Sequence, residues 1–293
     1  MAGNDVLLRG ETHVGASLPR WQLVSTVTIA VLSVVSTLLG LVRPGHYPPE
    51  LLPQFYVQDL VVLVVGVPAL LLGLWYATRG SLRGRVVWLG ALAYTSYMWA
   101  SVGLQLPFNR FFLGYVVLFS LSLFTFVAGT VGVDANTLRR ALAPHLAERV
   151  YAASLLLIAC GLASLWLAEL VPATRSGVPP LLVEEVGPQA LVSHFVDLGV
   201  VVPALIVAGG WLWRRHPWGY VFAGVALVFG ALLAPTVTGT TLVLVIDGSV
   251  TVPPVALVFT VLPAAVATVL AVTYLLAIPG SGPPAADDGT PPT

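Results

Sequence analysis

The sequence predicts an all-α fold, a polytopic bundle of about eight transmembrane helices built as two similar four-helix halves. Of the 293 residues, 57% are hydrophobic and only 9% are charged, and the mean hydropathy is +0.93. Soluble domains carry about a quarter charged residues, because water must solvate their surface. Several apolar runs approach or exceed the roughly 20 residues needed to cross a bilayer. We therefore expect a multi-pass integral membrane protein.

Eight apolar segments, separated by short polar ones, are interpreted as membrane spans. They run near Leu23–Val42, Val57–Ala77, Val86–Leu104, Phe111–Gly132, Val150–Val171, Ser193–Trp213, Tyr220–Leu242 and Pro254–Ala277. The seventh is the least regular, because Pro235 and a threonine-rich stretch interrupt it, so it is either a kinked helix or a partly unwound one. These spans divide the chain into an N-terminal tail, two halves and a C-terminal tail expected to be disordered. The boundaries are 1–20, 21–149, 150–277 and 278–293.

The arginines predict the orientation of the spans. All thirteen basic residues are arginine, and with both termini in the cytoplasm only Arg43, Arg110 and Arg175 lie outside. An excess of arginine in cytoplasmic loops is typical of membrane proteins. We therefore expect both termini of this plasma-membrane protein to be cytoplasmic.

A repeat of 135 residues supports the two halves. With this shift, Glu50 aligns with Glu185, Pro68 with Pro203, and Arg79 with Arg214, without a gap. Matches between proline, glutamate and arginine are harder to obtain by accident than matches between apolar residues. Because four spans separate the two copies, both halves keep the same orientation, and a pseudo-two-fold axis is expected along the membrane normal.

The chain resembles a known group of proteins, and the likeness extends through most of the spans. The stretches that carry this likeness are Gln58–Leu60, Pro68, Arg79–Arg85, Trp88–Gly90, Tyr94, Phe108–Asn109 and Leu118–Leu123. They are similar to an uncharacterised family of prokaryotic multi-pass integral membrane proteins with no assigned activity. The resemblance implies a membrane fold and transfers no catalytic residue.

The composition excludes several kinds of chemistry. The chain has no lysine, so it cannot form a Schiff base with retinal or pyridoxal phosphate. Cys160 is the only cysteine, which excludes an intramolecular disulfide and thiol oxidation by paired cysteines. The net charge of zero gives no reason to expect nucleic acid as a partner. We predict no cofactor, no metal site and no catalytic residue, and the expected partners are the lipid bilayer and an unidentified small molecule.

The candidate site lies toward the outer ends of the spans, where ionisable groups gather. Buried ionisable residues are costly in a membrane and are functional suspects by default. His194 and Asp197 are three residues apart, so on an α-helix they share one face, where the carboxylate would orient the imidazole. The repeat aligns His194 with Asp59, although Asp59 would also suit the cap of a helix N-terminus. We expect these three residues to converge on one outward-facing cavity, with Glu169 or Arg110 at its rim.

The third span adds polar residues on one helical face, which include Tyr97 and Gln105 and either bond to neighbouring helices or line a cavity. Three functions remain open. The best-supported is a permease-like transporter for a small solute, because duplicated halves and broken helices are common in transporters. The second is a scaffold or sensor subunit without chemistry. The third is a membrane-embedded enzyme that acts on a lipid or quinone at the outer leaflet, with His194 as acid or base and Asp197 as its orienter.

Overall fold

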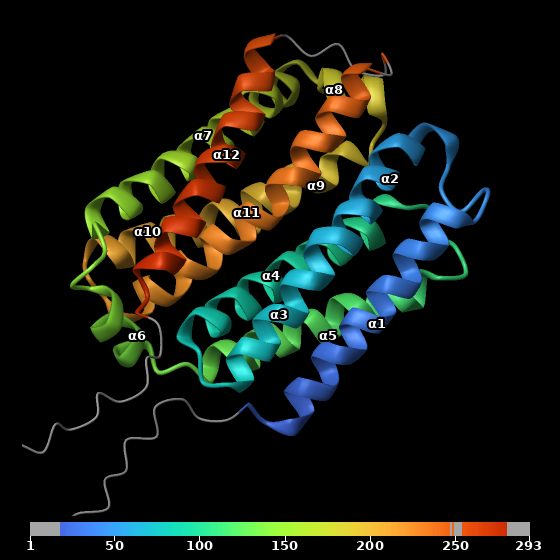
Figure 1. Ribbon diagram of the computed structural model, residues 1–293. Helices are drawn as coiled ribbons and strands as arrows, with labels where there is room; N and C mark the ends of the chain where they lie inside the picture. The colour runs from blue at the N-terminus through green and yellow to red at the C-terminus, as the bar shows by residue number, and fades with distance from the viewer. Residues whose placement is uncertain (1–17, 247, 249–253, 280–293) are drawn as a thin grey trace, which may run out of the picture.

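The structure is a computed structural model that describes residues 18–246, 248 and 254–279, and Figure 1 shows a bundle of roughly parallel and antiparallel helices. Among these residues the only regular secondary structure is helix, and no strand occurs. The first half contains α1 (Arg20–Val42), α2 (Leu52–Val61), α3 (Val67–Thr78), α4 (Leu82–Gln105) and α5 (Phe112–Val131). The second half contains α7 (Glu148–Ser176), α8 (Leu181–Val186), α9 (Ala190–Val196), α10 (Val202–Trp213), α11 (Pro217–Ile246) and α12 (Pro254–Ala277). The short helix α6 (Ala135–Leu142) joins them, and a 3₁₀ turn, Pro49–Leu51, precedes α2.

Six described helical segments are long and apolar enough to cross a membrane, counted by length and composition. They are Arg20–Val42, Leu52–Thr78, Phe112–Val131, Glu148–Ser176, Ala190–Trp213 and Pro217–Ile246. The other two expected spans correspond to α4, which carries the polar face noted in the sequence, and to α12, of which Val261–Ala277 forms a shorter apolar helix. The chain therefore has the helices of an integral membrane protein.

Two spans are regular helices except for one π-helical turn. Val62–Gly66 joins α2 to α3, and Asp197–Val201 joins α9 to α10. A proline follows each turn, Pro68 in the first and Pro203 in the second, and proline cannot donate a backbone hydrogen bond to the preceding turn. Single π-turns inside α-helices are frequent at functional sites. The seventh span is not unwound at Pro235, because α11 remains helical from Pro217 to Ile246.

The helices gather in two groups that meet along α4 and α11. In Figure 1, α1 to α5 lie on one side, in blue to green, and α7 and α9 to α12 lie on the other, in yellow-green to red. Contacts across the boundary join α4 to α11, α11 to α2, and α4 to α9. The buried core at this boundary includes Tyr94 of α4 and Val225 and Val228 of α11, all nearly inaccessible.

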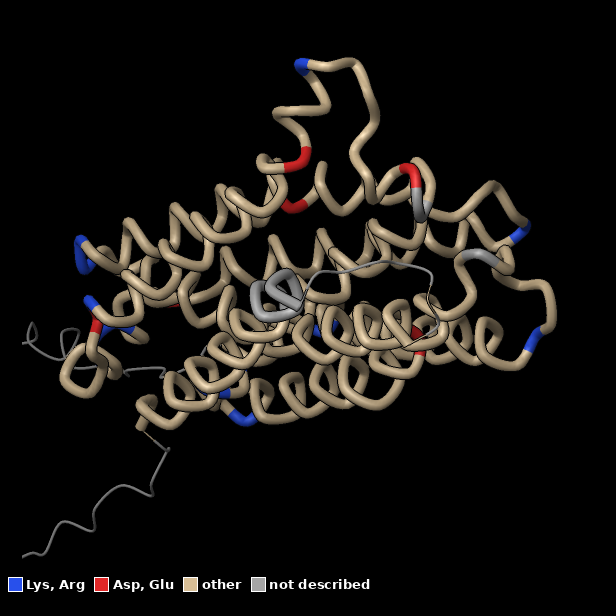
Figure 2. Tube along the Cα trace, turned by 90° about the horizontal axis from the view of Figure 1, so that it is seen from above, with Lys and Arg blue, Asp and Glu red and all other residues tan. Residues whose placement is uncertain are grey.

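Charged residues lie mainly at the helix ends and in the connections, as Figure 2 shows. Following the helices in chain order places nine described arginines at one end, which we call the arginine-rich end. They are Arg20, Arg79, Arg83, Arg85, Arg139, Arg140, Arg149, Arg214 and Arg215. The opposite end holds Arg43, Arg110 and Arg175, and we call it the acidic end because Asp59, Glu169 and Asp197 lie toward it.

The helix α6 was not predicted from the sequence. Asp134 caps its N-terminus by accepting hydrogen bonds from the backbone N–H groups of Asn136 and Thr137, at 3.0 and 3.1 Å. The Thr137 hydroxyl also donates to the carboxylate, at 2.6 Å, and this bond, followed by the backbone bonds, holds the pKa of Asp134 below its usual value. Leu138 and Leu142 are buried, whereas Arg139 is exposed, so α6 is amphipathic and packs against α11 at the arginine-rich end.

Candidate functional site

The centre of the candidate site is the carboxyl group of Asp197, at the first residue of the second π-helical turn. Its Oδ1 accepts a hydrogen bond from the Tyr97 hydroxyl at 2.9 Å, and its Oδ2 accepts one from the Trp166 indole N–H at 3.0 Å. Tyr97 belongs to α4 and Trp166 to α7, so the carboxyl joins helices from both groups. Only 7% of Asp197 is exposed, and a carboxyl buried this deeply requires such partners.

His194 lies beside this carboxyl but has different partners. Its Nδ1 is 2.9 Å from the Ala190 carbonyl oxygen, its Nε2 is 3.5 Å from Glu169 Oε2, and its ring lies 4.1 Å from the Trp166 ring. Both oxygens of Asp197 are occupied by donors from α4 and α7. The prediction that Asp197 orients His194 is therefore wrong, because the imidazole contacts the Ala190 carbonyl and Glu169 instead.

The protonation of His194 decides which of its two contacts can be hydrogen bonds. A neutral imidazole carries hydrogen on one nitrogen only, so it can donate to either the carbonyl or the carboxylate, but not to both. With Glu169 ionised, both contacts are hydrogen bonds only when both nitrogens carry hydrogen. Glu169 has a side-chain exposure of 37%, so its carboxyl group extends from the buried imidazole to the surface of the protein. The imidazole itself is 2% exposed, so an acid or base role on a lipid headgroup would require the surrounding helices to open.

Asp59 forms a second, separate cluster in the first half. It lies inside α2 and not at a helix N-terminus, so the capping interpretation is wrong. Its Oδ2 accepts a hydrogen bond from the Tyr47 hydroxyl at 2.6 Å, and 2% of the residue is exposed. Burial, and then the neighbouring Asp59 carboxyl, raise the pKa of Tyr47 well above its usual range, so its hydroxyl remains a donor. In the described part of the chain, no hydrogen bond or ion pair joins Asp59 to the Asp197 cluster.

Arg110 lies at the acidic end in a third cluster. A cavity of about 230 Å³ is lined there by Arg43, His46, Asn109, Arg110 and Phe111. The Arg43 and Arg110 guanidinium carbons lie 5.9 and 5.5 Å from the centre of the Phe111 ring. Burial, followed by the charges of Arg43 and Arg110, lowers the pKa of His46 from its ordinary value. This cavity therefore favours a neutral imidazole and carries positive charge.

The polar face of α4 contacts its neighbours at two points. The Tyr94 hydroxyl is 3.3 Å from Thr236 Oγ1 of α11, and Tyr97 bonds to Asp197. Ser101 is buried one turn beyond Tyr97, and Gln105 is half-buried at the end of α4. The structure thus brings together four of the predicted site residues, and leaves Asp59 and Arg110 in clusters of their own. The four are His194, Asp197, Glu169 and Tyr97.

Two features of the polar network were missed in the sequence. Trp166 was not among the predicted site residues, but it donates a hydrogen bond to Asp197 and packs on His194. At the arginine-rich end, buried Glu148 forms an ion pair with Arg215, with Oε2 and Nε 2.6 Å apart, and accepts a hydrogen bond from Tyr220. Glu148 begins α7, where a carboxylate is favoured by the helix dipole, and this position is the signal that could have revealed it.

The chemistry available at the Asp197 cluster is proton transfer and hydrogen bonding. Within residues 18–246, 248 and 254–279, no three His, Cys, Asp or Glu side chains are placed to hold a metal ion.

Comparisons of the chain with known protein families, with curated proteins and with solved structures find no match.

Proposed function

We propose that this protein is a permease-like membrane protein for a small solute, with two similar four-helix halves, eight spans and a polar site between the halves. The observation that carries the proposal is the position of Asp197. A buried carboxyl on a π-helical turn is held by one donor from each half, at the boundary between the two groups of helices. Solute sites of many transporters lie at such repeat interfaces and are formed by interrupted helices.

The duplicated halves are supported by matches in backbone structure at a spacing of 135 residues. The two π-helical turns, and the helices α3 and α10, have bounds that differ by this number. The turns that follow match as well, because Gly80 and Arg215 both have positive φ angles, of 77° and 56°. A pseudo-two-fold relation also accounts for the crossed contacts, in which α4 touches α9 and α11 touches α2.

The orientation proposed from the sequence places the arginine-rich end, and both termini, in the cytoplasm of the cell that carries the protein. Nine described arginines at that end and three at the acidic end support it. The site would then lie toward the outside.

Labelling of single cysteines tests this orientation. With Cys160→Ser as the background, Glu184→Cys lies in the acidic-end connection and His145→Cys in the arginine-rich end, both at exposed positions. We expect an impermeant maleimide to label Glu184→Cys in intact cells, and His145→Cys only after permeabilisation. The opposite pattern would contradict the orientation.

The permease function predicts that water reaches the polar face of α4 from the acidic end. Ser101 lies on this face, one turn from Tyr97, whereas Thr95 is buried on another face of the same helix and bonds to the Ala91 carbonyl. In the Cys160→Ser background, we expect Ser101→Cys to react with a small impermeant methanethiosulfonate added to intact cells. Thr95→Cys is the matched control and should remain unreacted.

A second candidate function, the non-catalytic scaffold or sensor subunit, is favoured by the packing between Tyr97 and the arginine-rich end. Trp88, Leu89 and Leu92 of α4 are fully buried there, and Gly90 lies so close to α11 that an added Cβ would be 2.5 Å from the Val228 side chain. Among the described residues, these apolar side chains lie between Tyr97 and the arginine-rich end. An unreactive Ser101→Cys would support the scaffold and contradict the permease.

A further inference from the structure

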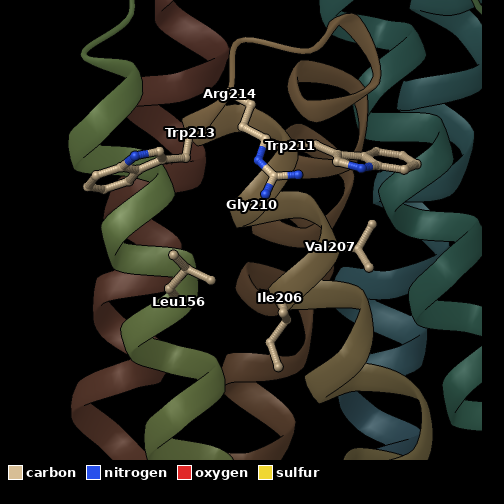
Figure 3. A pocket seen from close by; sticks show the side chains of 7 residues that line it. All are labelled: Leu156, Ile206, Val207, Gly210, Trp211, Trp213 and Arg214. Atoms are coloured by element: carbon tan, nitrogen blue, oxygen red, sulfur yellow. The ribbon is translucent and has the colours of Figure 1, made fainter.

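A groove opens on the outer surface of the second half, between α7 and α10 at the arginine-rich end (Figure 3). Its volume is about 470 Å³, and apolar side chains line its length, Leu156 from α7 and Ile206 and Val207 from α10. Ile206 and Val207 are 49% and 44% exposed on this surface. Gly210 forms part of the lining, and a Cβ added to it would meet no atom within 4 Å. In a membrane this groove is open to lipid.

Arg214 lies at the head of the groove, at the end of α10. Figure 3 shows its guanidinium group above Gly210, with Trp213 on one side and Trp211 on the other. Among the described residues, no hydrogen bond, ion pair or ring contact is made by the Arg214 side chain. The adjacent Arg215 is already paired with Glu148, so that carboxylate does not neutralise Arg214.

The corresponding place in the first half is filled. At the spacing of 135 residues, Arg214 corresponds to Arg79 and Gly210 to Trp75. The Arg79 guanidinium carbon lies 3.5 Å from the centre of the Trp75 ring, so the aromatic ring occupies the space beneath this arginine. The second half has glycine where the ring would be. This difference between the halves leaves the space below Arg214 open, and among the described residues the Arg214 side chain has no partner.

We propose that the groove between α7 and α10 binds one anionic phospholipid, with its phosphate on Arg214 and an acyl chain along Ile206 and Leu156. A guanidinium group presents two parallel N–H donors that match phosphate oxygens. Tryptophan favours the level of lipid headgroups, which suits the pair beside Arg214. The concentration of arginines at this end attracts anionic lipid in general, and the groove adds the shape that retains one molecule.

Native mass spectrometry of the detergent-purified full chain tests the proposal. The probe is an equimolar mixture of phosphatidylglycerol and phosphatidylcholine with identical acyl chains. One basic residue near an anionic lipid is worth a preference of about fivefold, and we expect the wild type to retain one phosphatidylglycerol with at least that preference. Arg214→Gln should remove it. Gly210→Trp, which recreates the arrangement beneath Arg79, should prevent retention of the lipid.

Arg79→Gln is the matched control, because it removes the same charge from the equivalent turn without touching the groove. We expect it to retain phosphatidylglycerol as the wild type does. Equal losses in Arg79→Gln and Arg214→Gln would mean a general charge effect and would overturn the proposal, as would displacement of the lipid by inorganic phosphate alone. If Gly210→Trp does not fold, as judged by gel filtration, the comparison of the two arginine variants decides the matter.

Discussion

Replacing either Gly84 or Gly219 by alanine is expected to lower the free energy of unfolding by about 3 kcal/mol, the upper part of the range for overpacking a closely packed interior. A Cβ on Gly84 would lie 2.4 Å from Tyr76 Cβ and 2.6 Å from the Ala77 backbone nitrogen. A Cβ on Gly219 would lie 2.4 Å from the Leu212 backbone nitrogen. Backbone atoms inside a helix cannot move aside as the end of a side chain can, so the helices themselves must separate.

The two glycines make equivalent contacts. Gly84 begins α4 and packs on the end of α3, and Gly219 begins α11 and packs on the end of α10. If the halves are copies of one unit, the two substitutions should have similar effects. Thermal melting of the purified variants in detergent measures both.

Gly161→Ala in α7 is the control, because its added Cβ meets no atom within 4 Å. Alanine favours a helix over glycine by about 1 kcal/mol, so this variant should be at least as stable as the wild type. If Gly84→Ala or Gly219→Ala melted at the same temperature as the wild type, the helices at these turns would not be packed as the structure has them.

The membrane helices could be predicted from the sequence because each is a long apolar run between polar connections. Their ends were less predictable, since a helix can continue past the membrane boundary. For example, α7 continues through Pro172 to Ser176, and α11 continues through Pro235 to Ile246. The short helix α6 could have been indicated by its cap, Asp134, and by Ala135, Leu138 and Leu142, whose spacing places them on one helical face.

The candidate site was predictable in its residues but not in its pairing. The spacing of His194 and Asp197 suggested a direct contact, on the assumption of a regular α-helix. The helix is regular from Ala190 as far as Asp197, but both oxygens of the carboxyl accept hydrogen bonds from other helices. The two donors to Asp197 come from α4 and α7, distant in the sequence, and no local pattern indicates which indole or hydroxyl will reach a given carboxylate.

Gly40 of α1 packs directly against the side chain of Asp59. A Cβ on Gly40 would lie 2.0 Å from Asp59 Oδ2 and 2.4 Å from the Tyr47 hydroxyl oxygen. These two atoms form the hydrogen bond that satisfies the buried carboxyl, at 2.6 Å. Gly40→Ala must displace both, and a buried polar group without its partner costs about 1–3 kcal/mol. We expect the free energy of unfolding to fall by about 2–3 kcal/mol.

A double-mutant cycle separates this effect from simple overpacking. In an Asp59→Ala background the carboxyl is absent, and the Tyr47 ring is no longer held by it. Gly40→Ala should then cost clearly less than in the wild type, because residues that share one hydrogen bond are coupled. Thermal melting of the two single variants and the double variant gives the coupling. Additive losses would mean that Gly40 acts on the helix packing alone and that the pair of Asp59 and Tyr47 does not depend on it.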